Sequence, residues 1–339
     1  MKRSLFAAAF LVAAFGAAQK QGCAQAETNF QTRKDVAYAT HDGVMLLGDL
    51  YLPMSSGRHP AMMFIHGGGF RAGSKSAYER SWGPYLAARG YVVFAIDYRL
   101  AKPEQAAWPQ ALLDCKAALQ YLRGNAGELG VDPNRIGVGG DSAGAELAAM
   151  LAVTQDWIAF TDKYPKDDYS GVSTKVRVAV PVYGVYDMMA WERYTATQSS
   201  NTPALDILFG GPPTAFPHSY FEASPIHYIH EAAKSLGFDG IENSATDTPW
   251  FVTWGAADAV VPPQGQSIPF VQALREAGAS VTTVEVPGVD HFWFTASALT
   301  GKKGTPKCDE GTPAKFTCSG ATPNDYISSQ LVDFLAHNL

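Results

Sequence analysis

The pattern of apolar and polar positions predicts strands that alternate with helices along most of the chain. Continuous apolar runs, typical of buried strands, occupy residues 61–65, 91–96, 135–139, 176–182 and 250–254, and an alternating strand follows at 281–286. Helical patterns occupy residues 76–90, the segment from Pro109, the segment around 146–150, part of 264–276 and the segment from Pro323 to the end. This alternation predicts an α/β fold with a mostly parallel sheet covered by helices on both faces.

Two details refine this pattern near the start of the chain. Residues 35–40 and 44–52 read as paired strands joined at Asp42-Gly43, which is a hairpin signal. Ser76-x-x-Glu79 has the form of a capping box, so we expect one helix over 76–90, kinked at Pro84 and ending at Gly90.

Two segments do not fit the alternation. Residues 187–246 are rich in proline, glycine and aromatic side chains and are too long for a simple connection, so we expect a cap insertion that contacts the substrate. Residues 300–324 form a second long loop. Residues 27–339, including both segments, are expected to form a single domain.

The first 26 residues have the layout of a signal peptide. Lys2 and Arg3 precede an apolar core at 5–18 that is too short to span a membrane, and Ala24-Gln25-Ala26 resembles a cleavage site. We therefore expect an exported protein, either periplasmic or secreted. Export permits disulfides, and a bridge between Cys308 and Cys318 would close the second long loop. Cys115 falls on the apolar face of a helix and is expected to be buried.

Composition narrows the classes of function. The 339 residues are 47% hydrophobic, which is sufficient for one large core, and the net charge of −6 without a basic stripe argues against a nucleic-acid partner. No Cys/His cluster has metal-ligand spacing and no glycine loop is suited to phosphate, so neither a metal nor a cofactor is implied. A small-molecule substrate fits these features better.

The segment Gly140-Asp141-Ser142-Ala143-Gly144 joins an apolar strand to a helix. A serine on so sharp a turn has a strained backbone and an exposed hydroxyl, and the glycines on either side let the strand and the helix approach each other. Ser142 is therefore a candidate nucleophile.

The segment His66-Gly67-Gly68-Gly69-Phe70 directly follows the apolar run at 61–65. Consecutive glycines leave backbone N–H groups uncovered, so they can donate to an oxygen on which negative charge develops. We expect the amides of Gly67 and Gly68, together with that of Ala143, to form an oxyanion hole.

These two motifs, with Asp97-Tyr98-Arg99-Leu100-Ala101 between them, resemble those of α/β-hydrolase esterases of the hormone-sensitive-lipase type. The resemblance extends from about residue 45 to the C-terminus. It implies the α/β-hydrolase fold, in which the acid and then the histidine follow the nucleophile along the chain.

That order indicates His291 and Asp258 as the partners of Ser142. His291 follows the strand at 281–286, and Asp258 follows the strand at 250–254, whereas Asp247 precedes a strand and Asp290 adjoins the histidine itself. The other histidines considered precede Ser142, lie away from a suitable strand end or fall in an irregular stretch: His41, His59, His218, His227, His230 and His337.

The resemblance implies a serine carboxylic-ester hydrolase that forms an acyl-enzyme. Aromatic residues beside the motifs or at the start of the insertion could line the substrate pocket and favour short-chain or aromatic esters, as in bacterial feruloyl-esterase-like enzymes: Phe70, Tyr183, Tyr186, Trp191 and Trp293. Two alternatives stay open, a serine peptidase or amidase with the same fold and a hydrolase-fold binding protein without catalysis.

Overall fold

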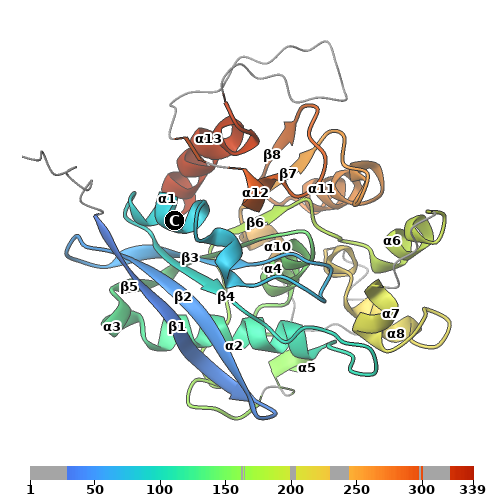
Figure 1. Ribbon diagram of the computed structural model, residues 1–339, viewed down its shortest axis with the longest axis horizontal. Helices are drawn as coiled ribbons and strands as arrows, with labels where there is room; N and C mark the ends of the chain where they lie inside the picture. Colours follow the sequence, from blue (N-terminus) through green and yellow to red (C-terminus); the bar gives the residue numbers. More distant parts are fainter. Residues whose placement is uncertain are drawn as a thin grey trace, which may run out of the picture.

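The computed structural model describes residues 29–161, 163, 165–198, 204–229, 244–297, 299–300 and 321–339 of this chain. Its centre is an eight-stranded sheet (Figure 1). The strands are β1 (Phe30–His41), β2 (Val44–Pro53), β3 (His59–Ile65), β4 (Val92–Ile96), β5 (Val131–Asp141), β6 (Ala179–Val182), β7 (Trp250–Gly255) and β8 (Val281–Val286).

The strand order is β1-β2-β4-β3-β5-β6-β7-β8. β1 and β2 form the expected antiparallel hairpin, and β2 is also antiparallel to β4. The pairs within the series β4-β3-β5-β6-β7-β8 are all parallel. The sequence prediction of a mostly parallel α/β sheet is therefore confirmed. Because the strands from β3 onward run the same way, their carboxyl ends and the loops that follow them meet at one edge of the sheet.

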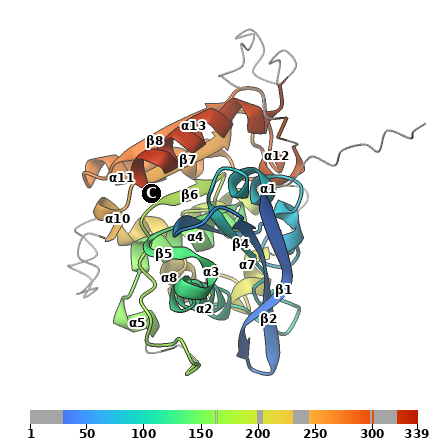
Figure 2. The same cartoon turned by 90° about the vertical axis from the view of Figure 1, so that its left-hand side faces the viewer.

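Helices cover both faces of the sheet, as the continuous apolar strands require. α1 and α13 lie on one side, and α2 and α4 lie on the other (Figures 1 and 2). The helices of the main domain are η1 (Lys75–Tyr78), α1 (Trp82–Ala87), α2 (Gln110–Gly124), α3 (Ala126–Leu129), α4 (Ala143–Thr154), α5 (Ile158–Thr161), η3 (Pro263–Gly265), α11 (Ser267–Glu276), α12 (Trp293–Ala296) and α13 (Pro323–Asn338).

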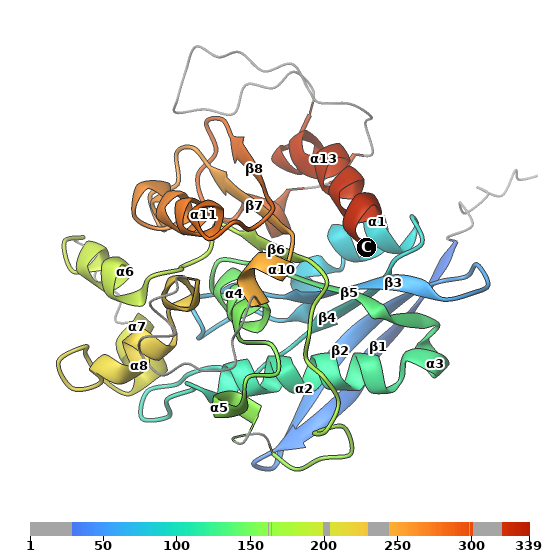
Figure 3. The same cartoon turned by 180° about the vertical axis from the view of Figure 1, so that it is seen from behind.

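The segment expected as a cap insertion contains short helices: α6 (Met188–Thr195), α7 (Ala204–Phe209), α8 (Pro217–Glu222), η2 (Pro225–Tyr228) and α10 (Ser244–Asp247). Of these, α6, α7 and α8 gather at one side of the molecule, while α10 lies near α4 (Figure 3). Residues 199–203 and 230–243 of this segment, which include His230, lie outside the described residues.

One helix prediction was wrong. Instead of a single kinked helix over residues 76–90, the chain forms η1 and then α1, and Ser76 caps neither of them. The reason is Pro84, which has no N–H and is placed in the first turn of α1, where no intrahelical partner is needed, so the helix begins at Trp82. A capping box does occur at α13, between Thr322 and Asp325.

Three other expectations concern the ends and the cysteines. Cys115 is free and fully buried on α2, as predicted. Residues 1–26, Cys308 and Cys318 lie outside the described residues. Within the described part of the chain, no helix is both long and apolar enough to cross a bilayer.

Candidate active site

Ser142 lies on a strained turn between β5 and α4. Its φ is +54° and its ψ is −119°, a conformation that costs a non-glycine residue about 1–3 kcal/mol. The flanking glycines make the turn possible, because a Cβ on Gly140 would lie 2.3 Å from the carbonyl oxygen of Gly144 and one on Gly144 would lie 2.0 Å from that of Ile65. The strand and the helix therefore approach as closely as the sequence pattern predicts.

The structure brings the three residues expected as a triad together. His291 Nε2 lies 2.9 Å from Ser142 Oγ, and His291 Nδ1 lies 2.6 Å from Asp258 Oδ2. The three residues follow β5, β7 and β8, whose carboxyl ends meet at the same edge of the sheet. The side chains of His291 and Asp258 are fully buried, so water does not compete for the bond between them.

The loop that carries Asp258 is held from several directions. Asp258 Oδ1 accepts the backbone N–H groups of Val260 and Val261 at 2.9 and 2.8 Å, which leaves Oδ2 for the histidine. From the insertion, Trp191 Nε1 donates to the carbonyl of Val260 and the Tyr194 hydroxyl donates to that of Ala259. Helix α6 therefore positions the acid of the site.

Asp290, the other acid considered for the triad, bonds to backbone amides instead of to the imidazole. Its Oδ1 accepts the N–H groups of Ala259 and His291 at 3.1 and 2.8 Å, so it joins the two loops that carry Asp258 and the imidazole. Asp247 belongs to α10, ahead of β7 rather than after it.

The expected oxyanion donors need one correction. The N–H of Gly67 donates to Asp141 Oδ1 at 3.1 Å, so it is not available for an oxyanion. By contrast, the amides of Gly68, Gly69 and Ala143 donate no hydrogen bond to any residue that the structure describes. Gly69 therefore joins Gly68 and Ala143 as a candidate donor in place of Gly67.

Asp141 links the glycine loop to the strand that carries the serine. Besides the Gly67 amide, its Oδ1 accepts the Tyr78 hydroxyl at 2.7 Å. Burial raises the pKa of Asp141, and the bonds from Tyr78 and Gly67 act in the opposite direction by favouring the carboxylate. The sequence placed Asp141 in a motif but did not show this contact with Gly67, which is 74 positions away.

His66 stiffens the same loop. Its ring stacks on Tyr98 at a centroid distance of 4.5 Å, its Nδ1 lies 2.7 Å from the carbonyl oxygen of Gly67, and the Tyr98 hydroxyl donates to the carbonyl of His66. Burial lowers the pKa of His66, which keeps the ring neutral and suits this structural task.

The five aromatic residues expected to line a pocket are all buried, with at most 8% of their surface exposed. The rings of Tyr183 and His291 lie 4.4 Å apart, and Trp293 packs edge-on against Tyr183 at 5.6 Å, so both lie at the site. Phe70 follows the glycine loop and has a φ of +62°. Trp191 reaches the site through the Asp258 loop, as described above.

Tyr186 does not belong to the site. Its ring stacks on Phe270 of α11 at 4.0 Å, and its hydroxyl accepts the N–H of Gly184. It is therefore a core residue that packs against α11, and its assignment to the pocket is corrected.

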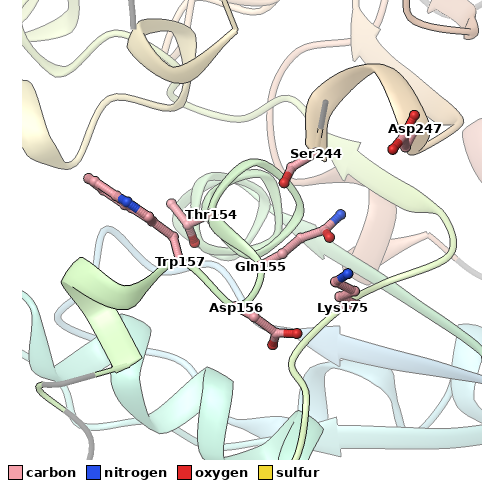
Figure 4. Close-up of a pocket in the computed structure, with 7 residues that line it drawn as sticks. All are labelled: Thr154, Gln155, Asp156, Trp157, Lys175, Ser244 and Asp247. Carbon is pink, nitrogen blue, oxygen red and sulfur yellow. The ribbon is translucent and has the colours of Figure 1, made fainter. Parts of the chain in front are cut away.

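A cavity of about 240 Å³ lies at the far end of α4, about 18 Å along the helix from Ser142. Its lining is polar and comes from three parts of the chain (Figure 4): Thr154, Gln155, Asp156, Trp157, Lys175, Ser244 and Asp247. Asp156 accepts hydrogen bonds from Ser173 and Thr174, and the Gln155 amide donates to Thr248. These side chains stabilise the end of α4 rather than a reacting group.

Comparison with known proteins shows which family the chain belongs to. The model of the BD-FAE family matches residues 48–274, which contain the glycine loop, the serine turn and Asp258. The chain belongs to the BD-FAE family. The α/β-hydrolase fold implied by the motifs is therefore confirmed, since solved esterases share it.

Individual relatives agree with that assignment. The chain is 31% identical to the probable carboxylic ester hydrolase LipM of Mycobacterium tuberculosis, covering 76% of this chain and 55% of the relative, and 45% identical to Lipase 2 of a Moraxella species, covering 70% and 55%. A solved truncated carbohydrate esterase from gut microbiota superposes with a TM-score of 0.65 at 26% identity, covering 78% of this chain and 91% of that one. The chain spans about half the length of these two curated relatives.

Proposed function

We propose that this BD-FAE protein is a serine carboxylic-ester hydrolase that works through an acyl-enzyme. The observation that carries the proposal is the continuous chain of hydrogen bonds from Asp258 to His291 to Ser142. In this chain Ser142 is the nucleophile, His291 is the general base and then the general acid, and Asp258 holds the ring so that Nε2 faces the hydroxyl.

In the first step Ser142 Oγ bonds to the ester carbonyl carbon while its proton passes to His291 Nε2. The tetrahedral intermediate collapses, the carbon–oxygen bond to the alcohol breaks, and His291 gives its proton to the departing alcohol. Water then attacks the acyl-enzyme with the same histidine as base, which releases the carboxylic acid and restores Ser142.

The negative charge of each tetrahedral intermediate needs donors placed in advance. The amides of Gly68, Gly69 and Ala143 have no partner among the described residues, and Ala143 is also the first residue of α4, whose N-terminus favours negative charge. We assign these three amides to the oxyanion hole.

The substrate we propose is a small-molecule ester with a short-chain or aromatic acyl group. The names of the relatives, a carboxylic ester hydrolase, a lipase and a carbohydrate esterase, support ester chemistry. The ring of Tyr183 packs on the imidazole and Trp293 packs on Tyr183, so the surroundings of the imidazole are aromatic, which suits an apolar acyl group better than a charged one.

Hydrolysis of p-nitrophenyl acetate tests the proposal. Ser142→Ala should lower kcat by at least about 10⁴-fold, whereas Ser56→Ala, at an exposed position in the β2–β3 connection, should not change it. A fluorophosphonate probe should label the wild type at Ser142 and fail to label Ser142→Ala. Full turnover by Ser142→Ala, or turnover of aminoacyl anilides without turnover of esters, would refute the assignment.

We also propose that residues 1–26 are removed on export, that the mature chain is periplasmic or secreted, and that Cys308 and Cys318 form a disulfide. N-terminal sequencing of protein from the periplasm and the medium should begin at Glu27. Intact mass before and after reduction and alkylation should show two cysteines that become accessible only after reduction. A mature protein that retains Met1 in the cytoplasm would contradict export.

A further inference from the structure

Phe292, the residue after His291, is a large apolar residue at a position where neither the backbone conformation nor burial in the core favours one. Its φ is +67°, in the left-handed region that favours glycine, and 58% of its surface is exposed. A glycine here would relieve the backbone, and no burial compensates for the strain. Residues held in this way at a site commonly serve function rather than stability.

The ring lies against the imidazole of the site. Its centroid is 4.6 Å from that of His291, at an interplanar angle of 87°, and His291 Nε2 is 2.9 Å from Ser142 Oγ. The adjoining loop exposes another apolar side chain, Val260, and the Ala259 amide bonded to Asp290 holds the two loops together. The exposed ring of Phe292 therefore borders the imidazole, and Val260 is a second exposed apolar side chain on the loop that carries Asp258.

The direction of proton transfer decides which part of a substrate meets the ring of Phe292. The proton that His291 accepts from Ser142 must go to the oxygen of the departing alcohol, so that oxygen lies next to Nε2 during the reaction. The remainder of the alcohol therefore extends past the imidazole, where Phe292 lies, while the acyl group is held by the carbonyl carbon near Ser142.

We propose that Phe292 is a specificity-determining residue that binds the alcohol part of the ester, and that this alcohol carries a ring with a flat apolar face, either an aryl group or a pyranose. This inference rests on the proposed ester hydrolysis. The ring of Phe292 gains contact with such a face, whereas a short aliphatic alcohol is too small to cover it.

The test measures kcat/KM, which reports acylation, on three acetates that share one acyl group: phenyl acetate, an acetylated methyl pyranoside and ethyl acetate. Phe292→Gly should lower kcat/KM about tenfold for at least one of the two ring-bearing acetates and by less than about twofold for ethyl acetate. Phe292→Tyr should keep wild-type values. Which of the two ring-bearing acetates responds identifies the ring as aryl or sugar.

Three controls separate the possible causes of a loss. Met54→Ala, which removes an exposed apolar side chain at the end of the β2 strand, should change none of the three values. Phenyl butyrate should show the same ratio of wild type to variant as phenyl acetate, because the acyl group does not meet Phe292. Phe292→Gly should keep or raise the Tm, whereas a residue needed for packing would lower it.

Equal losses on all three acetates, no loss on any of them, or a loss that follows the acyl chain would overturn the role of Phe292. The proposed function fails in a different way, since the wild type would then turn over no ester and the fluorophosphonate probe would not label Ser142.

Discussion

Replacing Lys116 with methionine should stabilise the protein, and the gain should depend on pH. Lys116 is fully buried on α2, and its Nζ donates to the carbonyl of Gln155, the residue that ends α4. Burial lowers the pKa of Lys116 from 10.5 to about 7. In the folded state the charged form of Lys116, at the end of the helix that follows Ser142, is therefore destabilised by burial.

The magnitude follows from that pKa. The difference of 3.5 between 10.5 and about 7 corresponds to about 5 kcal/mol at 1.36 kcal/mol per pKa unit. Between these two values the unfolded chain binds a proton that the folded chain does not, so the free energy of unfolding rises with pH across this window and is flat below it. The variant lacks this dependence. Its carbonyl partner keeps a second donor, because the Thr174 hydroxyl also bonds to Gln155.

Urea unfolding at pH 6, 8 and 10 measures the effect. We expect Lys116→Met to be more stable than the wild type by about 2–4 kcal/mol at pH 6, after about 1 kcal/mol is deducted for the lost hydrogen bond, and to lose that advantage by pH 10. Lys175→Met, which removes the same charge from an exposed position, is the control. A constant difference between Lys116→Met and the wild type at all three pH values would refute the reasoning.

Two further substitutions on α4 probe how it packs behind the serine. Gly144→Ala should lower the free energy of unfolding by at least about 3 kcal/mol and abolish ester turnover, because its Cβ would lie 2.0 Å from the Ile65 carbonyl oxygen. The control is Gly127→Ala, which has open space around it and should be neutral or slightly stabilising in thermal unfolding. Glu146→Leu should be stabilising by about 1–3 kcal/mol in urea unfolding at pH 8, because both carboxylate oxygens are buried without a hydrogen-bond partner among the described residues. Burial raises the pKa of Glu146, so the folded state keeps a proton that the unfolded chain releases above about pH 4.5. Wild-type stability should therefore fall as pH rises, and the advantage of leucine should be smaller at pH 5 than at pH 8. A Glu146→Leu variant that is less stable than the wild type at pH 8 would contradict this account.

The sequence was most informative where one local pattern decides the outcome. The parallel strands were predictable because apolar runs such as residues 61–65 and 250–254 can be buried only at the centre of a covered sheet. The candidate triad was predictable because the resemblance to α/β-hydrolases implies the order of acid and histidine after the serine, and each of the three follows a strand whose end lies at one edge of the sheet.

The remainder depends on contacts between distant segments. Whether an amide of the glycine loop faces a substrate or a carboxylate depends on how β3 and β5 pair, and that pairing puts Asp141 beside Gly67. The left-handed backbone at Phe292 follows the loop that Asp290 joins to the loop of Asp258, and no local pattern in the sequence indicates it.

Asp141 explains why the Gly67 amide faces a carboxyl group rather than a substrate. A carboxylate beside an oxyanion hole opposes the negative charge that develops there, and hydrogen bonds from the protein to that carboxyl group reduce this effect. The Gly67 amide and the Tyr78 hydroxyl both donate to Asp141 Oδ1, and these bonds favour the carboxylate against burial, which raises the pKa of Asp141. The Gly67 amide thus fixes the loop to the strand of the nucleophile, while the amides of Gly68 and Gly69, which have no partner among the described residues, are the ones we propose for the intermediate.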